Sequence, residues 1–168
     1  IFFQRLTLRL SKAIVVVTPQ LAEWIAKEVE GKPIYVIPNG ANTELFHPKA
    51  ALTYQVPGSY VVFFGAFARW QGIETILKAV ESNKWPEDVS LVLLGDGVER
   101  PKVEQVAAQN PKVLYLGKLP YRDVPGIIAH SIAGLSPKNN ELHSRTGLFP
   151  LKVFETLACG VPVVVTDF

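Results

Sequence analysis

Hydrophobic residues occur in short runs along the chain, and most of these runs alternate with stretches that repeat at helical spacing. Residues 13–17 (AIVVV) are an uninterrupted run rich in β-branched residues, which is typical of a buried parallel strand. Thr18 and Pro19 then predict a helix, with a threonine cap and proline at the first helical position, and Gly31 is expected to end it. The apolar positions expected on its inner face are Leu21, Trp24, Ile25 and Val29. With a second strand at residues 33–37 (PIYVI), this part of the chain predicts a strand–helix–strand unit.

The ten residues that precede this unit, IFFQRLTLRL, fit a basic amphipathic helix with Phe3, Leu6 and Leu10 on one side. Two interpretations remain open for this helix. It packs in a domain that this sequence lacks, or it lies on a membrane surface.

A strong turn signal, PNG at residues 38–40, is followed by a segment with little apolar periodicity and several turn-forming residues. We interpret residues 41–59 as a linker between two domains.

From Tyr60 onward, five apolar runs alternate with helical patterns. The expected strands are residues 60–64, 91–94, 113–116, 132–136 and 161–165, and the expected helices are residues 72–81, 101–109, 122–130 and 150–158. Short helical crossovers make neighbouring strands parallel, so the predicted fold class is α/β, with a doubly wound, Rossmann-like parallel sheet. Ligands of such sheets bind at the carboxyl ends of the strands. In this chain those ends are the loops that begin at Gly65, Gly95, Gly117, Ser136 and Thr166.

Composition narrows the functional classes. The chain is 48% hydrophobic and 19% charged, with a formal net charge of +2, which is typical of a globular protein. The absence of any Lys/Arg run argues against nucleic acid as a partner. The single cysteine, Cys159, excludes an internal disulfide and is expected to be a small buried apolar residue. Because the sequence has no methionine, we expect it to be a piece of a longer protein.

The stretch GDGVER (residues 95–100) invites comparison with dinucleotide-binding loops. That fingerprint needs a third glycine for close packing of helix and strand, and here the position is Arg100. It also belongs after the first strand of a unit, whereas this loop follows the second. We therefore interpret the stretch as a glycine-containing turn and expect no dinucleotide cofactor.

The loop after the Tyr60 strand is a better candidate for anion binding. Gly65 lets the backbone approach a ligand, and Gly72 starts a helix whose amides point back toward the loop. Arg69 and Gln71 lie between them and can donate hydrogen bonds to phosphate. The alternative is an ordinary loop with a solvent-exposed arginine.

The last stretch, GLFPLKVFETLACGVPVVVTDF (residues 147–168), predicts a helix that begins at Pro150. The free amides of Leu151 and Lys152, together with the lysine charge, form an anion site at its start. Glu155 follows about one turn later, and its carboxylate would accept hydrogen bonds from the vicinal hydroxyls of a ribose. Each feature alone has a structural explanation, with Lys152 solvated and Glu155 paired with a lysine. Together they indicate a nucleoside diphosphate site.

With these motifs in this order, the chain resembles the retaining glycosyltransferases of family 4, which have two Rossmann-like domains (the GT-B fold). The resemblance covers nearly the whole chain. The matching segments are IPNGANTELFHP (residues 37–48, with Asn42 where aspartate is usual), VVFFGAFARWQGIETILKA (61–79), VSLVLLGDGVERPKVEQVA (89–107), VLYLGKLPYRDVPGII (113–128) and PLKVFETLACGVPVVVTD (150–167).

The resemblance implies a donor site for a UDP-, GDP- or ADP-sugar, with no further cofactor and no obligatory metal. By this resemblance, Glu155 matches the second glutamate of the family's Glu–seven residues–Glu motif and would hold the ribose of the donor. The backbone amides of Leu151 and Lys152 would contact the diphosphate. The loop of Gly117, Lys118 and Leu119 matches the stretch whose backbone holds the base. Sugar transfer would retain the anomeric configuration.

The chain departs from the family pattern at three positions. The first glutamate of the motif falls on Gly147, the phosphate-binding arginine on Ala66 and its lysine on Gln71. Arg69 and Lys152 are expected to supply the missing charges, unless the site has relaxed or decayed. For the missing glutamate the expected substitute is Glu141, the candidate catalytic residue, with Asn139 and Asn140 as alternatives.

The resulting hypothesis divides the chain into three parts. Residues 1–40 are the end of an acceptor domain, residues 41–59 the linker, and residues 60–168 a donor domain truncated at its C-terminus. The full protein would transfer sugar to a glycan or lipid-linked acceptor in polysaccharide or glycolipid synthesis, in the cytoplasm or peripherally on the inner face of the membrane, and the isolated chain would be inactive. The alternatives are a nucleotide-sugar 2-epimerase of the same fold and a non-catalytic nucleotide-binding module.

Overall fold

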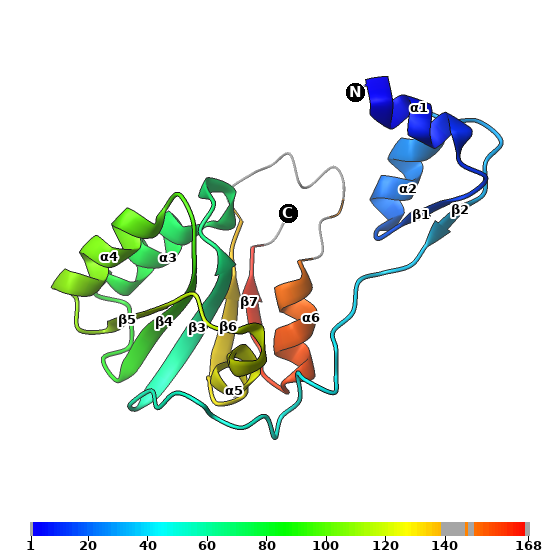
Figure 1. Cartoon of the computed structure of the whole chain (residues 1–168). Coiled ribbons are helices and arrows are strands. Elements are labelled where there is room, and N and C mark those ends of the chain that lie inside the picture. The colour runs from blue at the N-terminus through cyan, green and yellow to red at the C-terminus, as the bar shows by residue number, and fades with distance from the viewer. Residues whose placement is uncertain (1, 139–146, 148–149, 167–168) are drawn as a thin grey trace. The chain divides into compact units, whose positions relative to one another are not determined.

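The computed structural model describes residues 2–138, 147 and 150–166, with side chains from residue 5 onward. It contains two compact units. The first is built on residues 2–40 and the second on residues 41–138 and 151–166 (Figure 1). Among the described helices, none is long and apolar enough to cross a membrane.

The first unit is a strand–helix–strand unit preceded by a helix. Its elements are α1 (Phe2–Leu10), β1 (Ile14–Val16), α2 (Pro19–Ala26) and β2 (Ile34–Val36), and β1 pairs in parallel with β2. Thr18 caps α2 as predicted, since its side-chain oxygen accepts a hydrogen bond of 3.1 Å from the amide of Leu21. The small core of this unit contains Ile14, Val16, Ile25 and Val29.

Three details of the first unit differ from the sequence-based expectation. Helix α2 ends at Ala26, because the chain turns there and Gly31 (φ +69°) lies in a later turn. Trp24 is 43% exposed and does not join the inner face. In α1, Leu6 and Leu10 are exposed, and Leu8 packs against the core in their place.

The second unit is a five-stranded parallel sheet with the order β5-β4-β3-β6-β7. The strands are β3 (Ser59–Ala66), β4 (Val89–Asp96), β5 (Val113–Gly117), β6 (Ala133–Ser136) and β7 (Val163–Val165). This order reverses direction at β3, so the predicted doubly wound α/β fold is confirmed. In β3 and β4, Gly65 lies level with Gly95, which brings the carboxyl ends of the two central strands to one edge.

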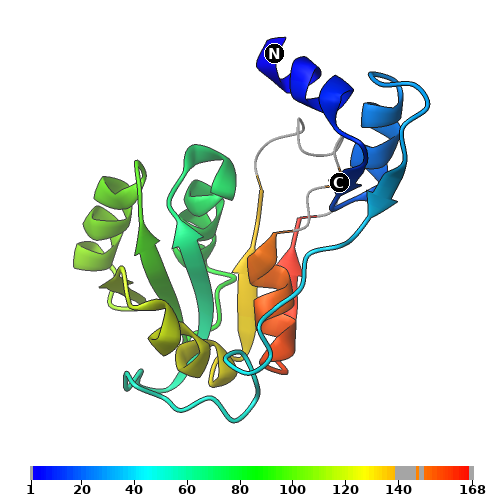
Figure 2. The same ribbon diagram turned by 45° about the vertical axis from the view of Figure 1, so that its right-hand side comes forward.

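Helices cover both faces of this sheet (Figure 2). Helices α3 (Ile73–Val80) and α4 (Arg100–Gln109) cover one face, where the apolar residues of α3 pack on Phe63 of β3. Helices α5 (Val124–Ala129) and α6 (Leu151–Ala158) contribute to the other face, where residues of α5 pack with Val62 and Phe64. The alternation of side chains along β3 thus produces two separate cores.

The segment that precedes β3 contains no helix or strand up to residue 58. It is nevertheless part of the second unit, because Phe46 is 0% exposed and belongs to the core on the α5 face. At the far end of α6, Cys159 is also buried in this core, as expected, and burial raises the pKa of its thiol to about 11.

Candidate functional site

The candidate site lies at the carboxyl ends of β3, β5 and β6. Gly65, the second-to-last residue of β3, has φ +125°, a backbone conformation that only glycine adopts readily. The chain then forms a short 3₁₀ helix, η1 (Arg69–Gln71), and Gly72 (φ +74°) is the N-cap of α3. A Cβ atom on Gly72 would lie 2.8 Å from the Pro137 side chain, so the loops after β3 and β6 are in contact.

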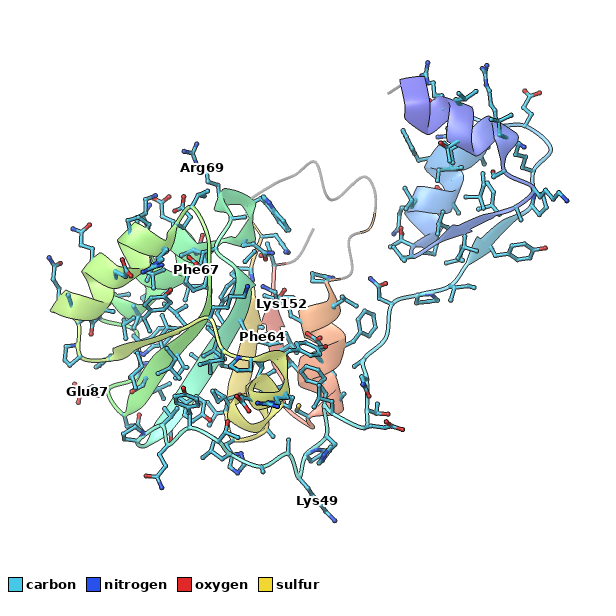
Figure 3. All side chains as sticks on the ribbon, viewed as in Figure 1. Lys49, Phe64, Phe67, Arg69, Glu87 and Lys152 are labelled. Atoms are coloured by element: carbon cyan, nitrogen blue, oxygen red, sulfur yellow. The ribbon has the colours of Figure 1, made fainter. Side chains whose placement is uncertain are left out.

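Lys152, in the first turn of α6, reaches across the end of β3 (Figure 3). Only 7% of this residue is exposed, and its Nζ donates a hydrogen bond of 3.1 Å to Oε1 of Gln71. The same Nζ lies 3.9 Å from the ring centroid of Phe63. A Cβ atom at Gly65 would lie 3.3 Å from the Nζ of Lys152, so any larger residue at this position would crowd the lysine.

A second lysine meets the same acceptor, and it was not among the residues predicted from the sequence. Lys138, two residues beyond β6, donates a hydrogen bond of 2.7 Å to Oε1 of Gln71. Its Nζ also lies 4.2 Å from the ring centroid of Trp70. The backbone amide of Lys138 donates to Oγ1 of Thr166, which fixes the loop beside the end of β7. The one available sequence signal was its place in a loop at the carboxyl end of a strand.

Burial of these two cations changes their acidity. Burial, together with the nearby charge of Lys138, lowers the pKa of Lys152 to about 7, although Glu155 opposes the shift. Burial lowers the pKa of Lys138 to about 8. Both ammonium groups are therefore held in an environment that disfavours their charge.

Glu155 lies one turn further along α6 and is 7% exposed. Its Oε1 accepts a hydrogen bond of 2.6 Å from the hydroxyl of Tyr121. Tyr121 begins the short helix η2 (Tyr121–Asp123), which follows β5. Burial of the hydroxyl, and then its hydrogen bond to Glu155, raise the pKa of Tyr121 to about 12. The carboxylate thus faces the loop after β5.

The other predicted site residues have varied positions. The side chain of Arg69 is 90% exposed and points away from the sheet, with its Nε 3.9 Å from Glu99 (Figure 3). Ala66 and Lys118 are exposed, Leu119 packs partly against the α5-face core, and Leu151 is 54% exposed. Gln71 is buried and acts as an acceptor, because protonated lysines can only donate.

The remaining candidates concern the long loop between β6 and α6. Gly147 is grouped with the first unit and lies against the side chain of Gln20. Glu141, Asn139 and Asn140 lie outside the described residues.

The GDGVER stretch forms a tight turn at the end of β4. A Cβ atom on Gly97 would lie 2.7 Å from the carbonyl oxygen of Phe67, so this backbone packs closely on the neighbouring loop. Among the described residues, no group of three or more His, Cys, Asp or Glu side chains is placed to hold a metal ion.

A family profile described as "Glycosyl transferases group 1" matches residues 58–168, which is most of the second unit. The chain belongs to the group 1 glycosyltransferases. A comparison with curated proteins gave no match.

Solved glycosyltransferase structures share the fold of this group 1 chain. Sucrose-phosphate synthase from Thermosynechococcus elongatus matches with a TM-score of 0.77 and 22% identity, over 98% of this chain and 43% of that one. Anabaena HepE, in complex with UDP and glucose, matches with a TM-score of 0.64 and 19% identity, over 92% of this chain and 44% of that one. The glycosyltransferase WaaG, involved in lipopolysaccharide biosynthesis, matches with a TM-score of 0.67 and 18% identity, over 98% of this chain and 47% of that one. The group 1 chain therefore spans less than half the length of each of these proteins.

Proposed function

We propose that this chain binds the nucleotide-sugar donor of a retaining glycosyltransferase, which transfers a sugar from a UDP-, GDP- or ADP-sugar to a glycan or lipid-linked acceptor. The observation that carries the proposal is the pair of buried, oppositely charged side chains on α6. Lys152 reaches over the end of β3, and Glu155 faces the loop after β5. This edge is where doubly wound sheets bind their ligands. A cation suits the diphosphate and a carboxylate suits the ribose hydroxyls.

The chemical role of the site follows from the charge that develops on the leaving diphosphate. The first amides of α6 and the ammonium of Lys152 would stabilise that charge without rearranging, because the helix and the buried side chain are already in position. Anabaena HepE was solved with UDP and glucose, which supports a diphosphate donor for this chain as well.

We place the reaction of the full protein in polysaccharide or glycolipid synthesis, in the cytoplasm or at the inner face of the membrane. Glu141 remains the proposed catalytic residue. The isolated chain is expected to bind the nucleotide weakly and to have no transferase activity. Turnover of a nucleotide sugar by the purified 168 residues would contradict this expectation.

One observation favours the second candidate, a non-catalytic nucleotide-binding module. Position 71 carries a neutral glutamine, and the nearby Arg69 is 90% exposed beside Glu99. The arginine therefore does not supply the charge that the family pattern has in this loop. A binding module would need only the lysines.

A binding panel tests the proposal. The purified chain is titrated with UDP, GDP, ADP and one sugar derivative of each, and binding is followed by NMR chemical shifts at millimolar ligand. The expected result is that one of the three bases is preferred, both as the diphosphate and as its sugar derivative. If none of the six compounds perturbs the spectrum, the proposed donor site is wrong.

A further inference from the structure

Lys138 and Lys152 share one neutral acceptor, the Oε1 atom of Gln71, at 2.7 Å and 3.1 Å. The two ammonium groups are therefore no farther apart than these two distances together. Each ammonium carries three donors and no acceptor, so a single amide oxygen satisfies only a small part of the pair. Both residues are only 7% exposed, which limits how much water can take its place.

Within the described part of the chain, no salt bridge neutralises this lysine pair. The carboxylate that acts on Lys152 is that of Glu155, which accepts a hydrogen bond from Tyr121. Arg69, on the neighbouring η1, lies beside Glu99. Because buried charges in proteins are normally paired, the lysine pair is suited to an anion that is not part of the protein.

Ser136 adds an independent observation at the same edge. It is 2% exposed, and within the described part of the chain its Oγ has no hydrogen-bond partner. Alternation along β6 puts Ser136 on the face of Gly134, where a Cβ atom would lie 2.6 Å from Thr156 of α6. A buried hydroxyl at this end of β6 therefore faces α6, where a phosphate oxygen would accept its hydrogen bond.

We propose that Lys138 is a second diphosphate-binding cation of the donor site, which holds the nucleotide together with Lys152, and that Ser136 adds a hydrogen bond to the same anion. The inference rests on the proposed function, because it names the groups with which that site holds its ligand. On binding, the ammonium groups exchange the oxygen of Gln71 for phosphate oxygens. One cation comes from the loop after β6 and the other from the first turn of α6.

The experiment compares Lys138→Gln with Lys49→Gln, which removes the same charge from an exposed residue away from Lys152 (Figure 3). Binding of UDP, GDP, ADP, their nucleosides and inorganic pyrophosphate is measured by NMR titration. Lys138→Gln should weaken the preferred diphosphate and pyrophosphate by about 10-fold or more, the loss typical of a charged hydrogen bond. The affinity of Lys138→Gln for the nucleoside should equal that of the wild type. Lys138→Arg should recover most of the diphosphate affinity. Lys49→Gln should bind every ligand as the wild type does.

The outcomes separate the inference from the function on which it rests. If Lys152→Gln weakens diphosphate binding and Lys138→Gln does not, the proposed role of Lys138 is rejected, while the proposed donor site is retained. If the wild-type chain binds none of the diphosphates, both are wrong.

A measurement on the unaltered chain covers the case in which Lys138→Gln fails to fold. The side-chain amines of Lys138 and Lys152 are titrated by NMR with and without pyrophosphate. Pyrophosphate should raise the pKa of both amines, and an unchanged pKa for Lys138 would overturn the inference.

Discussion

The hydroxyl of Tyr121 donates a hydrogen bond of 2.6 Å to Oε1 of Glu155, and this contact joins the loop after β5 to helix α6. The tyrosine ring also lies 5.3 Å from the ring of the buried Phe46, centroid to centroid. Glu155 is thus bonded to a residue that is 57% exposed but packs one face of its ring on the core. If Glu155 binds the ribose, Tyr121 is the residue that positions it.

Replacing Tyr121 with phenylalanine should weaken the binding of the preferred nucleoside diphosphate by about 3- to 10-fold, the usual net effect of one hydrogen bond. The ring contact with Phe46 is kept, so the midpoint of thermal unfolding should change little. Isothermal titration calorimetry gives the affinity. The control is Tyr54→Phe, at a tyrosine that is 43% exposed in the same unit. Equal affinities for wild type and Tyr121→Phe would argue against the positioning role.

Replacing Glu155 with glutamine should weaken nucleotide binding by about 10- to 100-fold, because charged hydrogen bonds to the ribose are lost. A sharper measurement compares each nucleotide with its 2′-deoxy form. Wild type should prefer the ribose, and Glu155→Gln should show little preference. Glu87→Gln, at an exposed site away from Lys152, is the control (Figure 3). A ribose preference that survives in Glu155→Gln would place the sugar contact elsewhere.

Replacing Lys152 with methionine should stabilise the ligand-free chain at pH 7 and below. Burial, helped by the charge of Lys138, lowers the pKa of Lys152 from 10.5 to about 7. Between these values the unfolded chain binds a proton that the folded chain has released, so the stability contributed by Lys152 rises with pH. The advantage of Lys152→Met should therefore be largest below pH 7 and should shrink toward pH 10.5.

Urea unfolding at several pH values measures this difference. Lys49→Met, at an exposed lysine away from Lys152, serves as the control (Figure 3). A gap between Lys152→Met and wild type that stays constant from pH 6 to 10 would contradict the lowered pKa.

Replacing Phe46 with alanine should reduce the free energy of unfolding by about 3–5 kcal/mol, the usual cost of removing a large buried aromatic ring. Phe46 is 0% exposed in the α5-face core, although it lies in the segment interpreted as a linker. Leu52→Ala, at a residue 37% exposed in the same segment, should cost much less. Equal costs for the two variants, measured by urea unfolding, would mean that the segment does not anchor to the core.

The sequence predicted the sheet well because its strands are short apolar runs and because α3, which lies between two of them, carries its apolar residues at helical spacing. It could not predict residues whose role depends on distant contacts. Lys138 and Gln71 are 67 positions apart, and Tyr121 and Glu155 are 34 apart. Arg69 and Gln71 are polar residues of the same loop, and the sequence does not distinguish them. In the 3₁₀ turn, however, the side chain of Arg69 is exposed and that of Gln71 is buried. Phe46 is an isolated aromatic residue, which gives no periodic signal.

The shared oxygen of Gln71 has a consequence for the thermodynamics of ligand exchange. The pKa values of Lys152 and Lys138, about 7 and about 8, leave the pair incompletely protonated near neutral pH. A bound diphosphate would raise both pKa values, although repulsion between the two lysines opposes this change. Glu155 also favours the protonated state of Lys152. Each binding event would then take up hydrogen ions from the buffer and each release would return them. The heat of nucleotide binding should accordingly vary with the ionisation enthalpy of the buffer.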